Sequence, residues 1–156
     1  MFEKVSTFQR FISEYKDSGK FYSVCSVGVP SKSCLEHLRK FRDKRIFYFG
    51  DLDAESLWVY LTFVFGNRKF GKNSKIKFNV KFAGLTPNDY DKFLSKKNVL
   101  IKIEPCEEKI LEFISDIKIS QLLDKIRFLK KGYKVEIEAL SLIGFDKYFE
   151  SKIKNL

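Results

Sequence analysis

The stretch RIFYFGDLDAESLW, Arg45 to Trp58, joins a continuously apolar run to two aspartates one residue apart. A run of branched and aromatic residues without polar alternation is typical of a strand buried on both faces, as in a parallel sheet. Ligands of open α/β sheets gather beyond the carboxyl ends of the strands, and Asp51 and Asp53 would stand there. The stretch therefore predicts a strand that delivers two carboxylates to the functional edge of a sheet.

Outside this stretch the apolar spacing alternates between a helical period and short strand-like runs, which favours an α/β fold. The 156 residues and the apolar share of 44% suit one domain with a single core. We expect a central, mainly parallel sheet of about four strands flanked by helices. The expected strands lie at 21–27, 45–50, 75–84 and 99–105.

We expect the whole chain, residues 1–156, to form that single domain. Its parts would be an N-terminal helix within 1–19, the core sheet with the two aspartates within 21–104, and C-terminal helices within 105–156. Thr86, Pro87 and Asp89 have the spacing of a capping box that opens a helix. The tail from Tyr133 is ambiguous, because KVEIEAL suits either a strand or a helix.

The net charge of +10 favours polyanionic partners such as nucleic acid. No acidic residue occurs between Ser56 and Asn88, although several cations do. This segment predicts a phosphate-binding patch, with a solvated lysine-rich surface as the alternative. Its candidate nucleic-acid-binding residues are Arg68, Lys69, Lys72, Lys75, Lys77 and Lys81.

The cysteines and the apolar runs indicate a cytoplasmic protein with no membrane association. Three scattered cysteines suit a reducing cytosol without disulfides. A zinc site at Cys25, Cys34 and His37 is a weak alternative, because no close cysteine pair is present. The charged start MFEKVSTFQRF lacks the apolar core of a signal peptide. The longest apolar run, Leu57 to Phe65, is far shorter than the ~20 residues of a spanning helix.

The two aspartates are candidate metal ligands. Alternate residues after a strand project to the same side, so Asp51 and Asp53 can converge on one point. Hard oxygen ligands beside a basic surface suit Mg²⁺ or Mn²⁺ bound together with substrate phosphate. In the competing interpretation Asp53 only caps a helix that starts near Ala54.

The motif IFYFGDLDAESL resembles the second motif of the Toprim (topoisomerase-primase) domain. It is similar to the GD-L/I-D-x-x-G form of the nuclease component of the Wadjet anti-plasmid system and to the same motif in the A subunits of type IIB topoisomerases. VKFAGLTPNDYDKFL and GYKVEIEAL fall where Wadjet-type proteins carry an AGL segment and an acidic LEQE-like block. The likeness covers about Phe21 to Leu140.

The resemblance implies a Rossmann-like three-layer sandwich in which Asp51 and Asp53 hold a divalent metal for phosphodiester chemistry. Such families also use a glutamate at the end of the first strand as a general acid or base. The corresponding place in SVCSVGVPSKS offers Val27 before Gly28, so that glutamate is missing there. Ser56 also stands where glycine is common in the motif.

Other acidic residues are candidates for the missing role. Glu136 and Glu138 match the acidic block by type and spacing and rank first, ahead of Glu55 and Glu104. The alternative for the first pair is an exposed charged face beside Lys134. With Asp51 and Asp53, this pair completes the expected catalytic set.

The sequence thus predicts Mg²⁺-dependent phosphodiester chemistry on DNA or RNA, as in a metal-dependent nuclease. The alternative is a catalytically inactive nucleic-acid-binding or interaction module that serves protein partners in a larger complex. In a third interpretation, Gly66 to Lys72 approximates a phosphate-binding P-loop one residue short. That interpretation requires LWVYLTFVF to be a strand, as its β-branched and aromatic content favours, whereas the Toprim resemblance makes it a helix.

Overall fold

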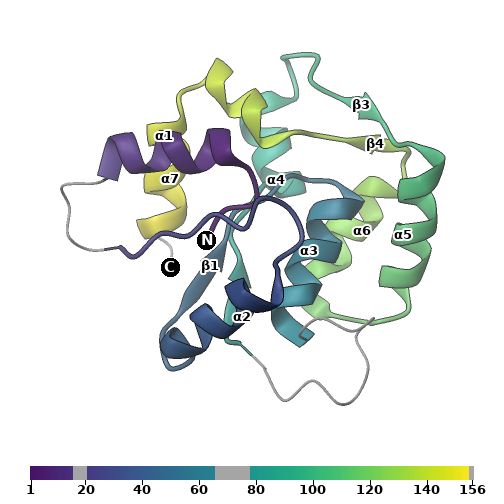
Figure 1. Cartoon of the computed structure of the whole chain (residues 1–156). Helices are drawn as coiled ribbons and strands as arrows, with labels where there is room; N and C mark the ends of the chain where they lie inside the picture. The colour runs from purple at the N-terminus through teal and green to yellow at the C-terminus, as the bar shows by residue number, and fades with distance from the viewer. Residues whose placement is uncertain (16–20, 66–77, 155–156) are drawn as a thin grey trace.

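The structure is a computed structural model that describes residues 1–15, 21–65 and 78–154. Helices and short strands alternate along most of this chain (Figure 1). The longer elements are α1 (Val5–Tyr15), α2 (Lys32–Leu38), β1 (Ile46–Tyr48), α3 (Ala54–Phe65), β2 (Val80–Phe82), α5 (Pro105–Ser115), α6 (Leu123–Leu129) and α7 (Phe145–Lys154). The shorter ones are η2 (Arg39–Phe41), α4 (Pro87–Asp89), η3 (Tyr90–Leu94), β3 (Ile101–Lys102), η4 (Ser120–Leu122), β4 (Tyr133–Lys134) and η5 (Ile137–Leu142).

The apolar run before the aspartates forms β1, as predicted, and pairs in parallel with β2. Ile46 aligns with Val80 and Tyr48 with Phe82. On its other edge β1 meets the N-terminus, because Phe2 makes a parallel bridge to Phe49. A second parallel bridge joins Phe2 to Cys25. The N-terminal residues are therefore held between the 21–27 segment and β1.

The expected sheet of about four strands is not formed in the described residues. Residues 21–27 make one bridge at Cys25 and no regular strand. The segment expected as a fourth parallel strand instead gives β3, which pairs antiparallel with β4 in a separate sheet. An antiparallel bridge between Leu52 and Val135 joins this second sheet to the aspartate turn. The fold is thus mixed α/β with a small parallel sheet.

Two aromatic layers cover the two faces of the parallel pair, because neighbouring strand residues point in opposite directions. Phe49 packs against Phe2, with ring centroids 5.0 Å apart, and against Phe149 of α7 at 5.5 Å. On the other face Tyr48 packs against Tyr60 of α3 at 5.9 Å. Figure 1 shows α1 and α7 side by side on one side of β1, and α3, α5 and α6 on the other. The core consequently extends through both layers.

LWVYLTFVF is helical, within α3, as the Toprim resemblance implied. Leu61 and Phe63, two positions apart and so on opposite sides of this helix, are both fully buried, so tertiary packing overrides local β-propensity. The P-loop interpretation, which required a strand here, is wrong. Its residues from Gly66 to Lys72 lie outside the described residues.

Several local predictions are confirmed. Thr86 and Asp89 form a reciprocal capping box with Pro87 at the start of α4. The ambiguous tail contains both possibilities, since β4 is followed by the 3-10 helix η5. Across the described ranges, every helix falls short of the length or apolar character needed to cross a membrane.

Candidate active site

The two aspartates lie where the parallel pair ends and the chain turns into α3. Gly50 and Gly84 allow this turn, because a Cβ on Gly84 would lie 2.3 Å from the Gly50 carbonyl oxygen. At the same place, where the two backbones come close, the Leu85 N–H donates a 3.1 Å hydrogen bond to the Gly50 carbonyl. The side chain of Asp51 is buried, and its Oδ1 accepts a 2.8 Å hydrogen bond from the Ile137 backbone N–H. This contact fixes one oxygen of Asp51.

Asp53 caps α3, as the sequence suggested. Its Oδ1 accepts a 2.6 Å hydrogen bond from the backbone N–H of Ser56. Burial raises the pKa of Asp53 to about 7, with further contributions from the negative charges of Asp51 and Glu3. Burial is thus the main cause of this rise, and the negative charges of Asp51 and Glu3 add to it.

Glu3 is a third carboxylate in this cluster, and sequence reasoning missed it. Its Oε2 accepts hydrogen bonds from the Tyr48 hydroxyl at 2.5 Å and from Ser56 Oγ at 2.6 Å. Ser56 Oγ in turn accepts a 3.0 Å hydrogen bond from the Asp51 N–H. Val27, the expected place of the glutamate, is 70% exposed. The carboxylate that reaches the aspartates therefore comes from the N-terminal residues and not from 21–27.

A signal for Glu3 exists in the sequence. In an α/β fold helices usually alternate with strands, and the apolar residues just before the helix within 1–19 are Met1 and Phe2. Two apolar residues are too few for a periodicity argument, since strands are usually 3–10 residues long. The bridges of Phe2 nevertheless make these residues part of the parallel sheet. Glu3 thus follows a strand-like segment, just as Asp51 follows β1.

The oxygen of Asp51 that Ile137 does not bind faces Lys4. Lys4 Nζ lies 2.8 Å from Asp51 Oδ2. Burial raises the pKa of Asp51 to about 6, and contacts with Lys4 and Ile137 oppose that rise. Burial alone would lower the pKa of Lys4, but hydrogen bonds and attraction from Asp51 and Glu138 outweigh it and raise that pKa above its usual range. The ammonium group stays positively charged.

The structure brings Glu138 to the aspartates through Lys4 and leaves Glu136 at the margin. Lys4 Nζ lies 2.8 Å from Glu138 Oε2 and 4.0 Å from Glu136 Oε2. Burial favours a higher pKa for Glu138, but the hydrogen bond from Lys4 prevails and lowers it. Glu104 instead belongs to the capping box of α5, and Glu55 is exposed. Among the acidic alternatives, Glu138 is the one tied to Asp51.

The donor set fits a divalent cation. In the described part of the chain no group of three or more His, Cys, Asp or Glu side chains is arranged to hold a metal by itself. Mg²⁺ typically takes one or two carboxylates together with water and substrate phosphate, so Asp51 and Asp53 meet its needs. Asp53 and Glu3 make no ion pair with any lysine or arginine whose side chain is described. A cation there would offset the burial and the neighbouring negative charges that raise the pKa of Asp53.

The predicted basic patch and the zinc alternative have different outcomes in the structure. Among the six candidate nucleic-acid-binding residues, only Lys81 is described, and its side chain is exposed on β2. Arg68, Lys69, Lys72, Lys75 and Lys77 lie outside the described residues. The zinc alternative gains no support, because His37 Nε2 makes a 2.9 Å hydrogen bond with the Tyr22 hydroxyl.

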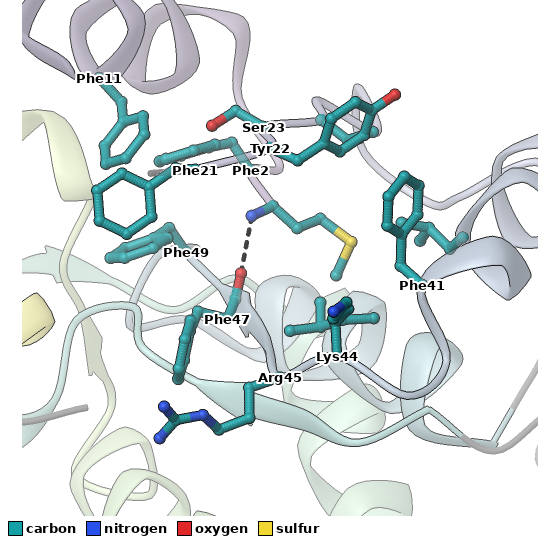
Figure 2. A pocket seen from close by; sticks show the side chains of 14 residues that line it. Phe2, Phe11, Phe21, Tyr22, Ser23, Phe41, Lys44, Arg45, Phe47 and Phe49 are labelled. Carbon is teal, nitrogen blue, oxygen red and sulfur yellow. Dashed lines mark hydrogen bonds between the residues drawn. The ribbon is translucent and has the colours of Figure 1, made fainter. Parts of the chain in front are cut away.

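A cavity of about 600 Å³ lies apart from the carboxylates. Figure 2 shows its aromatic walls, formed by Phe11, Phe21, Phe41, Phe47 and others. No carboxylate is among its described lining residues, and its charged side chains are the cations of Lys44 and Arg45. Its lining is thus apolar and aromatic, unlike the acidic cluster.

The parallel pair with acidic residues beyond its carboxyl end defines an α/β domain whose site lies at the strand ends. The family model for the Toprim domain of topoisomerase 6 A-subunit/Spo11 proteins matches residues 1–155. The chain belongs to this family of nucleic-acid-processing domains. The match begins at residue 1, so it includes Glu3, which lies before the likeness that the motifs show from Phe21 onward. No curated protein matches the chain.

Proposed function

We propose that this chain carries out Mg²⁺- or Mn²⁺-dependent phosphodiester chemistry on DNA or RNA, with Asp51 and Asp53 as the metal seat. The observation that supports this most is the meeting of Glu3 with both aspartates around Ser56. A bound divalent ion would neutralise charge on the phosphate and favour deprotonation of an attacking water.

The residues of the chain itself would divide the remaining work. One carboxylate oxygen of Asp53 accepts a hydrogen bond from the Ser56 N–H at the N-terminus of α3, and this contact orients the other oxygen. Glu3 is positioned by Tyr48 and Ser56, so we assign it the general acid or base role that the Toprim resemblance implies. Glu136 and Glu138 stay candidates for catalysis, and Glu138 is joined to Asp51 through Lys4.

The test is cleavage of plasmid and single-stranded substrates in Mg²⁺ or Mn²⁺. The wild-type chain should cleave, and the double variant Asp51→Ala with Asp53→Ala should not. Glu3→Gln should lose on the order of a hundred- to ten-thousand-fold in rate, as removal of a general acid or base does. Glu36→Gln is the matched control, because Glu36 lies on α2 and pairs only with the exposed Lys32 at 3.8 Å. Absent wild-type cleavage, or cleavage that survives the double variant, contradicts the proposal.

A second candidate is a catalytically inactive nucleic-acid-binding module of a larger complex. The observation that favours it is that both oxygens of Asp51 already have partners, the Ile137 N–H and Lys4 Nζ. In this case Arg68, Lys69, Lys72, Lys75, Lys77 and Lys81 would grip phosphates. Affinity should then fall with salt by about 0.7–0.9 units of log–log slope for each phosphate contact. Binding that does not respond to salt would count against this candidate.

A further inference from the structure

The ammonium group of Lys4 lies among the carboxylates of Asp51, Glu136 and Glu138. Lys4 Nζ lies 2.8 Å from Asp51 Oδ2, 2.8 Å from Glu138 Oε2 and 4.0 Å from Glu136 Oε2. Three carboxylates from two separate segments of the chain thus converge on a single cation. Among the described residues these carboxylates are not arranged to hold a metal ion by themselves, and the ammonium group of Lys4 supplies the positive charge beside them.

The position of this ammonium group is fixed from both ends. Lys4 directly follows Glu3, whose carboxylate is held by Tyr48 and Ser56. On the opposite side, Glu138 is oriented by Ser6, whose Oγ donates to Glu138 Oε1 at 2.9 Å. The cation is therefore part of the fold, and its covalent attachment keeps its local concentration high against ions in solution.

Asp53 and Glu3 lack an ion-pair partner of this kind among the described residues. The carboxylates of Asp53 and Glu3 make hydrogen bonds to Ser56 and Tyr48, but no ion pair within the described part of the chain. Lys4 thus pairs directly with Asp51, whereas the positive charge that Asp53 attracts is that of Lys134, whose ammonium group pairs with Glu107 at 2.7 Å. Two-metal phosphodiester sites place their ions about 3.5–4 Å apart, one on each side of a shared group.

We propose that Lys4 takes the place of a second divalent ion, so that the site binds one ion, on the side of Asp53 and Glu3. This inference rests on the proposed metal seat at Asp51 and Asp53. Lys4 is a positioning residue here, because it touches Asp51 and Glu138 and not the substrate. Removing its charge while keeping the fold should open a second cation position between Asp51, Glu136 and Glu138.

The number of bound ions tests this directly. Mn²⁺ is titrated into the whole chain, and the bound fraction is measured by electron paramagnetic resonance and by equilibrium dialysis. The wild type should bind one Mn²⁺ and Lys4→Met two. Lys4→Gln, which keeps a hydrogen-bond donor without the charge, should also bind two and serves if the methionine variant does not fold. Lys32→Met, at a side chain 90% exposed on α2, is the control and should bind one.

The difference between the counts separates this inference from the proposed function. No ion in the wild type would contradict the metal seat at Asp51 and Asp53 and with it the proposed function, whereas one ion in the wild type and two in Lys4→Met is the result specific to Lys4. Equal counts in the two proteins, or two ions in the wild type, would overturn the inference about Lys4. No cleavage measurement enters this comparison.

Discussion

Ser56 joins Glu3 to the aspartate turn, because Ser56 Oγ donates a 2.6 Å hydrogen bond to Glu3 Oε2. The same hydroxyl oxygen accepts from the Asp51 N–H at 3.0 Å, and the Ser56 N–H donates to Asp53 Oδ1 at 2.6 Å. One fully buried residue therefore contacts all three carboxyl-bearing residues of the site. The position that carries glycine in related motifs here carries the hydroxyl that orients Glu3.

Replacing Ser56 by Ala should destabilise the chain and loosen Glu3. The variant keeps the backbone N–H that caps Asp53, but it loses the donor to Glu3 and the acceptor for the Asp51 N–H. A lost hydrogen bond to a charged group lowers the free energy of unfolding by about 1.5–3 kcal/mol. Urea denaturation measures the change. Ser13→Ala, at an exposed serine that bonds only the Arg10 carbonyl, should stay within about 0.5 kcal/mol, and an equal effect of both variants would contradict this role.

The raised pKa values of the aspartates predict that stability falls as pH rises. The pKa of Asp53 is about 7 in the folded chain against a reference value of 3.8, and that of Asp51 is about 6. Between about pH 4 and pH 7 the folded state keeps protons that the unfolded chain has released. The contribution of the two aspartates to the free energy of unfolding therefore decreases across this window, and that contribution changes little below it.

Asp53→Asn removes the larger of these effects. The asparagine oxygen can still cap α3, so at about pH 8 the variant should be more stable than the wild type by on the order of 1–3 kcal/mol, and the difference should shrink towards about pH 4. Thermal unfolding across this pH range is the measurement. Added Mg²⁺ should raise the wild-type melting temperature at about pH 8 more than that of the variant. A variant that is less stable than the wild type at this alkaline pH would contradict the sign of the effect.

Local signals predicted much of this molecule. The stretch before Gly50 became β1, Asp53 became a helix cap, and Thr86 and Asp89 formed their capping box. Each of these features depends on residues within a few positions of one another. Apolar periodicity and capping chemistry report such short-range structure directly.

Long-range pairing set the remaining features. Phe2 becomes strand-like through its bridges to Phe49 and Cys25, which lie in distant parts of the chain. Residues 99–105 pair antiparallel with residues after α6, which the apolar pattern of a strand does not encode. Glu3 and Lys4 enter the site through these pairings. A pattern confined to neighbouring residues therefore located the aspartates but not their partners.

A buried ion pair between α4 and α7 predicts unequal effects of its two members. Lys152 Nζ lies 2.6 Å from Asp89 Oδ2, and both side chains are largely buried. Asp89→Ala removes the carboxylate that accepts the hydrogen bonds of Thr86 and leaves the buried Lys152 ammonium unpaired. It should therefore lower the free energy of unfolding by about 3–5 kcal/mol. Lys152→Met should have a smaller effect, because Asp89 Oδ2 keeps its hydrogen bonds from the Thr86 N–H and Oγ.

Denaturation of both single variants and of the double variant measures the coupling between Asp89 and Lys152. The double variant should be more stable than Asp89→Ala alone, since the cation that was left unpaired is gone. Equal losses in the two single variants would mean that the cap of Thr86 contributes nothing.

Gly84 should be the glycine that tolerates a side chain least, because its backbone crosses the turn that carries Asp51. A Cβ there would lie 2.3 Å from the Gly50 oxygen and 2.6 Å from the Gly50 nitrogen, and no side-chain rotation can relieve a clash with backbone. Gly84→Ala should lower the free energy of unfolding by about 3 kcal/mol or more and weaken Mn²⁺ binding, since moving Gly50 moves Asp51.

Gly28→Ala is the control, because Gly28 has φ +80° but nothing within 4 Å of an added Cβ. It should lose only the ~1–2 kcal/mol of the left-handed conformation and keep its Mn²⁺ affinity. Chemical denaturation and Mn²⁺ titration of both variants decide the point, and a milder effect at Gly84 than at Gly28 would show that the close crossing of the two backbones does not hold the aspartates in place.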